Sequence, residues 1–307
     1  MKACTESMSQ ERFVWRYEGH QVALGVNRLG RGPAVLLLPA LSSISTQTEM
    51  HPLQKCLAHR FTTITVDWPG FGTLPRAFLD WRPAFYRDFV ECALSELAPT
   101  PYAIIAAGHA AAYVVDHCAS HGAASRHLVL LSPTWRGPLP TMLGGDRAIF
   151  ARLAKAFDPP VVGALLYRLN INRFVVAMMA RGHVYEDPGW LTRARLREKL
   201  AVSGARGARH ASARFVTGRL DPFRHRADML AALGRVRVPV LNMFSEHAPP
   251  KSRLEMEAMA HAVNVTTVRA SMGKLSFYEE HASIAADAIL DFLAPDAVHT
   301  PDPADAG

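Results

Sequence analysis

A histidine stands where a predicted buried strand turns into a predicted helix, in the stretch YAIIAAGHAAAYVVDHCASHG at residues 102–122. An imidazole with an unperturbed pKa of about 6.5 can accept or donate a proton near neutral pH, so His109 is a candidate acid–base group. The chain has 14 histidines, and the alternative is that His109 only packs or hydrogen-bonds near the sheet. The turn from Gly108 to Ala112 is centred on Ala110, which has no nucleophilic atom.

A lysine and several glutamates form a second set of groups capable of chemistry, nearer the C-terminus. Lys274, in the stretch SMGKLSFYEEH, could act as a base or form a Schiff base if its amine were removed from water. Glu246 is a further candidate acid or base. The alternative for Lys274 is an ion pair with Glu246, Glu279 or Glu280, because structural ion pairs also occupy such positions.

Continuous apolar runs bounded by turn residues predict strands that are buried on both faces. These runs lie at residues 34–41, 61–72, 102–107, 125–135, 238–245 and 263–270. Helical spacing of apolar residues follows most of them, at residues 46–58, 83–98, 110–121, 251–262 and 283–293. The alternation predicts an α/β fold with a mostly parallel sheet and helices on both faces. A hairpin that turns near residues 18–20 precedes it.

The alternation lapses in the middle of the chain, where residues 136–234 have mainly helical patterns. We therefore predict a core formed by residues 10–135 and 235–294, with residues 136–234 inserted as a helical lid. The proline-rich, polar segment at residues 295–307 predicts a disordered tail.

Five motifs occur in a fixed order along the chain. They are GPAVLLLPALSS, VDWPGFG, GHAAA, VPVLNMFSEHAPP and ASMGKLSFYEEHASIAADAILDFL. Each motif is weakly specific, but together and in this order they resemble the α/β-hydrolase superfamily, in its lid-bearing branch with epoxide hydrolases, haloalkane dehalogenases and small esterases. The resemblance spans residues 13–293. It implies the α/β-hydrolase fold with an inserted helical lid.

The resemblance also implies where a catalytic triad would lie. The serine, aspartate and histidine positions of the family correspond to Ala110, Ala248 and Lys274, so no catalytic residue is present at its family position. A serine hydrolase needs an oxygen nucleophile, an imidazole and a carboxylate. We therefore expect a degenerate triad and no ordinary esterase activity.

Backbone donors of an oxyanion hole could persist without the triad. The resemblance assigns them to Leu41 and Ala111, and neither is proline. We predict that Ala110 keeps the strained conformation of a nucleophile turn and aims the Ala111 N–H group into a pocket. The predicted pocket is lined by Leu41, Ser42, His109, Ala110, Ala111, Trp135, Glu246 and Lys274.

Composition excludes several functional classes. The net charge is +7, and all but six of the 34 basic residues are arginine, but no nucleic-acid-binding motif accompanies them, so we expect no nucleic-acid partner. The four cysteines have no metal-binding spacing, and we expect neither metal nor cofactor. We see no signal peptide and no apolar run of membrane-spanning length, which favours a cytoplasmic location.

Three functions remain open. The first is a non-hydrolytic protein that binds a small apolar, carbonyl-bearing ligand under the lid. The second is an enzyme with relocated chemistry (a lyase, cyclase, isomerase or atypical hydrolase) that uses Lys274, His109 or Glu246. The third is a membrane-peripheral or complex-assembly protein that uses the apolar and basic surface of the lid.

Overall fold

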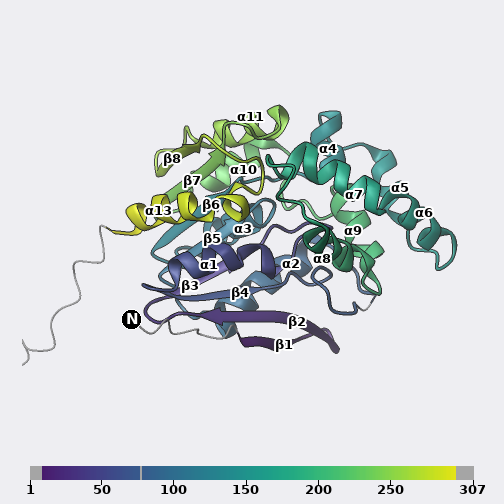
Figure 1. The fold of residues 1–307 in the computed structure, drawn as a ribbon, viewed down its shortest axis with the longest axis horizontal. Helices are drawn as coiled ribbons and strands as arrows, with labels where there is room; N and C mark the ends of the chain where they lie inside the picture. The colour runs from purple at the N-terminus through teal and green to yellow at the C-terminus, as the bar shows by residue number, and fades with distance from the viewer. Residues whose placement is uncertain (1–8, 77, 295–307) are drawn as a thin grey trace, which may run out of the picture.

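The computed structural model describes residues 9–76 and 78–294, which form a single sheet covered by helices (Figure 1). The eight strands lie in the order β1-β2-β4-β3-β5-β6-β7-β8. Their bounds are β1 Ser9–Tyr17, β2 His20–Leu29, β3 Ala34–Leu38, β4 Thr62–Val66, β5 Ala103–Ala107, β6 His127–Leu131, β7 Val240–Ser245 and β8 Val265–Ala270. The first two strands are antiparallel to their neighbours and the other six run parallel. The predicted α/β-hydrolase fold is confirmed.

A hydrophobic layer lies on each face of the sheet, because successive side chains of a strand point to opposite faces. In β3, Leu36 and Leu38 pack into one layer, while Val35 and Leu37 pack into the other. Helices α2 (Pro83–Cys92), α3 (Ala110–His121) and α10 (Arg226–Leu233) cover the first layer. Helices α1 (His51–Leu57) and α13 (Ala282–Leu293) cover the second. These four residues of β3 are essentially inaccessible to water, as their apolar run predicts.

A helical insertion separates β6 from β7 and lies beside the ends of the parallel strands (Figure 1). Its elements are α4 Pro138–Leu143, α5 Ala148–Ala156, α6 Val162–Asn170, α7 Arg173–Met179, the π-helical turn Ala180–Val184, α8 Arg193–Gly204 and α9 Ala208–Val216. The predicted range of the lid also includes α10, which instead belongs to the core. Met229, Ala232 and Leu233 of that helix are buried in the first hydrophobic layer.

The remaining elements connect the strands and helices of the core. A short 3₁₀ helix, Gln47–Met50, precedes α1, and a π-helical turn, Ala93–Leu97, follows α2. Helix α11, Pro250–Met259, follows β7, and the short α12, Phe277–Glu280, follows β8. The predicted disordered tail at residues 295–307 lies outside the described residues. Among the described residues, no helix combines the length and apolar character needed to cross a bilayer.

Candidate functional site

The sharp turn after β5 is made by Gly108 rather than by Ala110. Gly108 has a φ of +52°, and Ala110 is absent from the non-glycine residues with positive φ in the described chain. The Gly108 N–H donates to the Leu131 carbonyl at 2.8 Å, and the Gly108 carbonyl accepts from Thr134 N–H at 3.0 Å. The predicted strain at Ala110 is therefore wrong, because glycine takes the left-handed conformation at little steric cost.

Because the turn is made two residues earlier than predicted, the predicted oxyanion donor is also lost. Ala110 is the first residue of α3, and the Ala111 N–H donates to the Gly108 carbonyl at 3.2 Å instead of pointing into a pocket. A Cβ atom built on Gly108 would lie 3.0 Å from the Cβ of Ala40. Neither Gly108 nor Ala110 carries a nucleophilic atom. The signal that sequence reasoning missed is the glycine directly after the strand.

The polar groups of the loop after β3 are also bonded within the protein. The Ala40 N–H donates to Glu49 Oε1 at 2.6 Å, and the Leu41 side chain is completely buried. Ser42 Oγ accepts from the Ile44 N–H at 3.4 Å, so this hydroxyl stabilises a local turn. These contacts fix the loop against the core.

His109 lies in the core and contacts the end of the lid. Its Nε2 atom is 3.3 Å from the Leu220 carbonyl and 3.4 Å from Asp221 Oδ1. Burial lowers the pKa of His109 to about 4 and raises the pKa of Asp221 to about 7. Both shifts favour the neutral forms, so this is a hydrogen-bonded contact rather than a charged pair. Because His109 is only 1% exposed, it is placed to hold Leu220 and Asp221 against the β5 turn.

The two loops that the family resemblance linked to the acid and the base contact the lid instead. Glu246 is exposed, and Ala248 is buried beside Phe244 and Met256. Glu186 of the lid joins both loops, since its carboxylate lies 2.5 Å from His247 Nδ1 and accepts from the Gly273 N–H at 2.5 Å.

Lys274 binds the lid backbone rather than a carboxylate. Its Nζ atom donates to the Arg181 carbonyl at 2.8 Å and to the Gly182 carbonyl at 3.2 Å. The predicted ion pair with Glu246, Glu279 or Glu280 is not among its contacts in the described chain. The adjacent Ser276 N–H donates to the Val184 carbonyl at 3.0 Å. The loop after β8 therefore closes against residues 181–184.

A buried ionic cluster lies between the core and the lid, and we name it the inner cluster. It consists of Glu49, Tyr185, Lys199, Tyr278 and Glu279. Lys199 Nζ is 3.3 Å from Glu279 Oε2 and 4.0 Å from Glu49 Oε2. The Tyr185 hydroxyl donates to Glu279 at 2.6 Å, and the Tyr278 hydroxyl donates to Glu49 at 3.0 Å. Sequence reasoning did not find this cluster, because three separate parts of the chain supply it.

One lysine faces two buried carboxylates in the inner cluster. Burial raises the pKa of Glu49 to about 7, an effect that Lys199 opposes and Glu279 reinforces. Glu49 Oε2 has no hydrogen-bond partner and lies 4.0 Å from Lys199 Nζ, so little offsets the burial that favours the neutral form of this carboxyl. The cluster joins α8 of the lid to the segments after β3 and β8.

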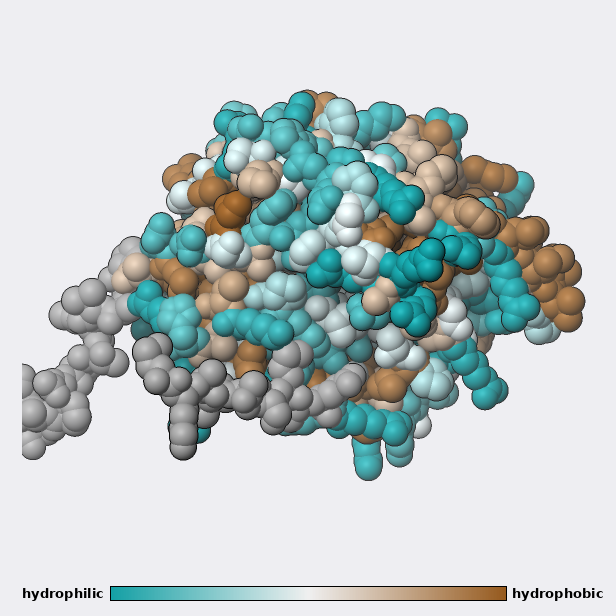
Figure 2. Space-filling view, in the orientation of Figure 1, coloured by the Kyte–Doolittle hydropathy of each residue, from teal (hydrophilic) through white to brown (hydrophobic). Residues whose placement is uncertain are grey.

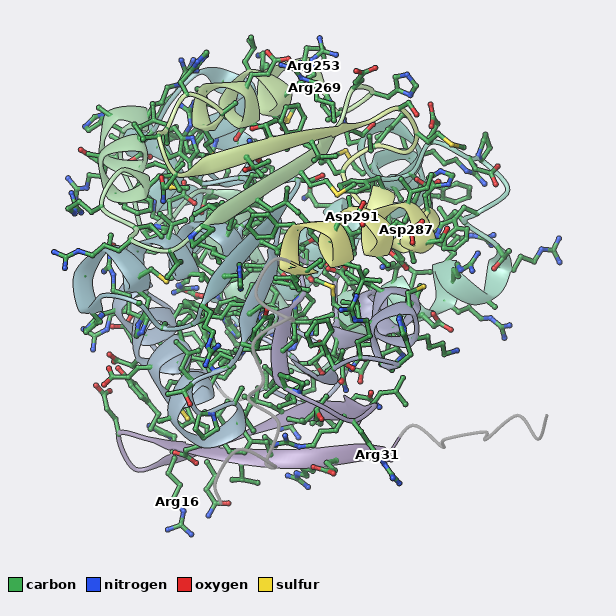
Figure 3. All side chains as sticks on the ribbon, turned by 90° about the vertical axis from the view of Figure 1, so that its left-hand side faces the viewer. Arg16, Arg31, Arg253, Arg269, Asp287 and Asp291 are labelled. Atoms are coloured by element: carbon green, nitrogen blue, oxygen red, sulfur yellow. The ribbon has the colours of Figure 1, made fainter. Side chains whose placement is uncertain are left out.

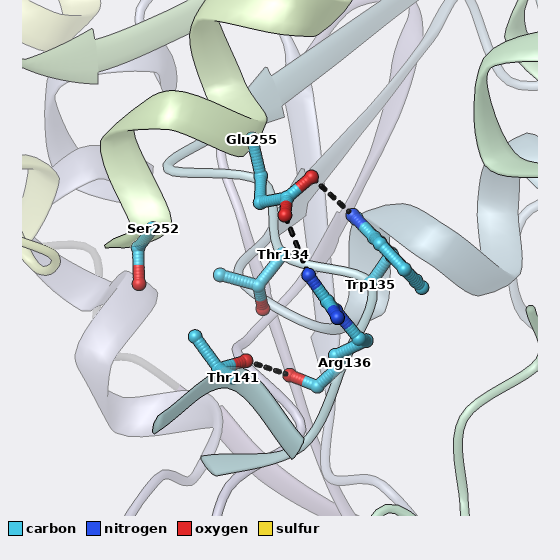
Figure 4. A pocket seen from close by; sticks show the side chains of 6 residues that line it. All are labelled: Thr134, Trp135, Arg136, Thr141, Ser252 and Glu255. Carbon is cyan, nitrogen blue, oxygen red and sulfur yellow. Dashed lines mark hydrogen bonds and ion pairs between the residues drawn. The ribbon is translucent and has the colours of Figure 1, made fainter. Parts of the chain in front are cut away.

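Trp135 lines a very small cavity rather than a ligand pocket (Figure 4). Its Nε1–H donates to Glu255 Oε2 at 3.1 Å, and Arg136 donates to Glu255 Oε1 at 2.6 Å. The cavity, with Thr134, Thr141 and Ser252 also on its wall, has a volume of about 10 Å³. That volume holds one water molecule at most.

The predicted pocket residues are therefore dispersed. Leu41, His109, Ala110 and Ala111 are packed in the core, Glu246 faces solvent, and Lys274 binds the lid. Ser132, directly after β6, is a serine with positive φ, at +44°, and its buried hydroxyl has no partner. In the part of the chain that the structure describes, no group of three or more His, Cys, Asp or Glu side chains is arranged to hold a metal ion.

Comparison with known proteins agrees with this architecture. The model of the alpha/beta hydrolase family matches residues 35–296. The chain belongs to this family. Among curated proteins, no sequence matches the chain.

Solved structures of this family superpose over most of the chain. Wild-type Cfl2 from Burkholderia cenocepacia is 19% identical with a TM-score of 0.72, covering 94% of this chain and 99% of its own. A bromoperoxidase from Bacillus anthracis is 15% identical with a TM-score of 0.69, covering 92% and 100%. The DbeA-M1 loop variant of a haloalkane dehalogenase from Bradyrhizobium elkanii is 16% identical with a TM-score of 0.68, covering 94% and 97%. At these identities the likeness concerns the fold.

Proposed function

We propose that this alpha/beta hydrolase family member is non-hydrolytic and binds anionic membrane surfaces through the outer face of its lid. The observation that carries the proposal is a set of exposed apolar side chains on neighbouring lid helices, which we name the lid face. The lid face consists of Ile149, Leu153, Val161, Val162, Leu165, Leu169, Phe174 and Met178. Figure 2 shows the corresponding brown surface where Figure 1 places α5 and α6.

The non-hydrolytic part of the proposal rests on the turn after β5. A hydrolase of this fold presents its nucleophile on that strained turn and uses the N–H of the next residue as an oxyanion donor. Here the strained residue is Gly108, and the inner cluster joins the lid to the strand ends above which a substrate would lie. The carbonyl-bearing ligand is not part of the proposal, because the predicted donor, the Ala111 N–H, is bonded within its own turn and the predicted pocket residues are dispersed.

The exposure of the lid face is unusual for a surface that stays in water. Phe174 is 76% exposed, Val161 is 78% exposed and Leu169 is 63% exposed. Single exposed apolar residues are common, but a contiguous apolar surface marks an interaction site. Side chains of this type lie at the boundary between headgroups and acyl chains when an amphipathic helix binds a bilayer.

Charge selects an anionic membrane as the partner. Six exposed basic side chains accompany the lid face: Arg147, Arg152, Lys155, Arg168, Arg173 and Arg181. The only acidic residue between positions 147 and 185 is Asp158, which is paired with Arg214 at 3.0 Å. Each basic residue near an anionic bilayer contributes about 1 kcal/mol of binding free energy.

The opposite end of the molecule has a different charge pattern. Figure 3 shows Arg253 and Arg269 on one part of that end and Asp287 and Asp291 on α13. Both signs of charge are present on that end, as is usual for the surface of a globular domain. The lid differs from that end in the number of exposed large apolar side chains that accompany its basic residues.

Vesicle co-sedimentation tests the proposal. We expect the protein to bind vesicles containing phosphatidylglycerol more tightly than vesicles of phosphatidylcholine alone. Replacing both Leu169→Asp and Phe174→Asp should weaken binding at least about tenfold, because two buried apolar contacts are lost and two negative charges are added. The matched control is Val263→Asp, which changes a fully exposed valine on the turn before β8.

Two results would contradict the proposal. One is equal vesicle binding by wild type and the double variant. The other is a stable dimer in the absence of lipid that the double variant abolishes, since the lid face would then bind a second copy of the chain.

A further inference from the structure

An open groove of about 450 Å³ lies between the loop after β4 and the junction of α8 with α9. Three arginines line it, Arg76, Arg206 and Arg209, together with Phe78, Gly207 and His210. No acidic side chain is part of its wall. It is separate from the turn after β5 and from the inner cluster.

None of the three guanidinium groups forms an ion pair with a carboxylate among the described residues. Arg209 donates to the Phe157 carbonyl at 2.9 Å and to the Asp158 carbonyl at 3.4 Å, and these bonds hold its side chain in place. Arg206 is exposed. Unneutralised positive charge in a concave, partly buried site focuses the electrostatic potential and attracts anions.

Arg76 is the most buried of the three. Its Nη2 atom donates to the Val202 carbonyl at 2.7 Å and to the Gly72 carbonyl, while Nε and Nη1 have no hydrogen-bond partner. Burial lowers the pKa of Arg76 to about 10, so the group remains charged at neutral pH. A buried charge is costly for the folded protein, and the Asp67 carboxylate offsets part of that cost without forming an ion pair with Arg76. An anion in the groove would lower that cost.

Two features add to the positive potential and shape of the groove. Gly207 is the N-cap of the nine-residue helix α9 and supplies no side-chain cap, and the Ala208 and His210 N–H groups at this end donate to the carbonyls of Ala205 and Gly207. The Phe78 ring, 61% exposed, lies 4.5 Å from the His210 ring in an edge-to-face contact. The groove thus combines cationic donors with an aromatic wall.

We infer that this groove binds the phosphate group of a phosphate monoester whose organic part packs against Phe78. Guanidinium groups match phosphate oxygens through paired hydrogen bonds, and a dianion with three terminal oxygens can engage several arginines at once. The inference is independent of membrane binding by the lid face.

Isothermal titration calorimetry with phenyl phosphate and inorganic phosphate tests the site. We expect saturable binding of both probes, with phenyl phosphate binding more tightly because Phe78 contacts its ring. Arg206→Glu should weaken binding at least about tenfold, since a charge-assisted hydrogen bond is lost and a repulsive charge is added. The matched control Arg224→Glu makes the same charge change at an exposed arginine that does not line the groove, and it should alter the affinity less than about twofold.

Vesicles distinguish a soluble ligand from a lipid headgroup. If the physiological ligand is a lipid, Arg206→Glu weakens binding to phosphatidic acid, a monoester, more than binding to phosphatidylglycerol, a diester. If the ligand is soluble, Arg206→Glu weakens phenyl phosphate binding and changes the affinities for the two kinds of vesicle by the same factor. The inference is overturned if neither phosphate probe binds saturably at ~10 mM, or if Arg206→Glu and Arg224→Glu have the same effect. Failure of the lid-face variants to alter vesicle binding would contradict the proposed function and leave this test unaffected.

Discussion

The two sides of the lid differ in whether their charged groups are paired and their apolar groups are buried. On the inner side, Lys199 and Glu279 form an ion pair that water hardly reaches, and backbone bonds join Ser276 to Val184. On the outer side, Phe174 and Leu169 are exposed, and residues 147–185 have one acidic residue, Asp158, beside five exposed arginines. The charged groups of the inner side have their partners within the molecule. The apolar and basic side chains of the outer side are free to contact another surface.

Under the proposed function, this difference accounts for a lid that is retained in a non-hydrolytic member of the family. A lid that opens over a substrate needs an inner side with few fixed contacts. Here the inner side is fixed by buried hydrogen-bonded charges, and breaking such contacts is expensive. This agrees with the proposal that the outer side of the lid is the surface that binds a partner.

The largest expected effect comes from breaking the inner cluster. Lys199→Met should lower the free energy of unfolding by about 3–5 kcal/mol, because Glu49 and Glu279 remain buried without a cation. Lys155→Met, on the exposed side of α5, should change it by less than about 0.5 kcal/mol. Chemical denaturation measures both. A loss below about 1 kcal/mol for Lys199→Met would mean that the cluster does not hold the lid.

A pH series sharpens the same comparison. Because burial raises the pKa of Glu49 from 4.5 to about 7, the folded protein binds a proton more tightly than the unfolded chain. This contribution to stability is fully present below pH 4.5 and is lost as pH rises to about 7. The stability of Glu49→Gln minus that of wild type should therefore increase across this window, by up to about 1.4 kcal/mol per pH unit.

The control for the pH series is Glu198→Gln, on the exposed side of α8. Its stability difference from wild type should be flat over the same range, because its carboxylate meets water in both states. A flat difference for Glu49→Gln as well would show that Glu49 has the same pKa in the folded protein and in the unfolded chain.

A smaller effect is expected from single charges on the outer side. Arg173→Gln should weaken binding to phosphatidylglycerol vesicles about fivefold, corresponding to about 1 kcal/mol. The effect should shrink as salt is added, since exposed charges are screened. Arg31→Gln, at the sheet end of the molecule shown in Figure 3, is the matched control. Equal losses for both variants would indicate attraction by net charge rather than by the lid face.

The smallest expected effect is on hydrolysis. Gly108→Ser and Ala110→Ser should both lack p-nitrophenyl butyrate turnover and fluorophosphonate labelling, because His109 is neutral, buried and committed to Leu220 and Asp221. Circular dichroism checks that each variant is folded. A burst of acylation by either variant, or labelling of Ser132 in wild type, would show that a working nucleophile site persists.

The sequence predicts the sheet and its covering helices well because local patterns encode them. Apolar runs such as residues 34–38 become central strands, and the glycine-containing turn at residues 18–19 joins β1 to β2 as expected. The boundary of the lid was harder to predict. Helix α10 has the composition of a lid helix, and only its packing against α3 assigns it to the core.

The candidate site was predicted less well because it depends on single backbone angles and distant contacts. The GHAAA motif allows the turn to centre on Ala110, but the positive φ lies at Gly108. Lys199 and Glu279 are separated by 80 residues and have no sequence pattern that pairs them. The apolar and basic character of the lid helices was visible in the sequence, but only the structure separates their buried side chains from their exposed ones.

Hydrogen–deuterium exchange of the wild-type protein with and without phosphatidylglycerol vesicles tests the central claim most directly. We predict slower exchange in peptides covering α6 and α7, at residues 162–179, and unchanged exchange around residue 263 at the turn before β8. Unchanged exchange in α6 and α7 while the protein is bound to vesicles, or protection centred on the end that carries α13, would contradict membrane binding through the lid face.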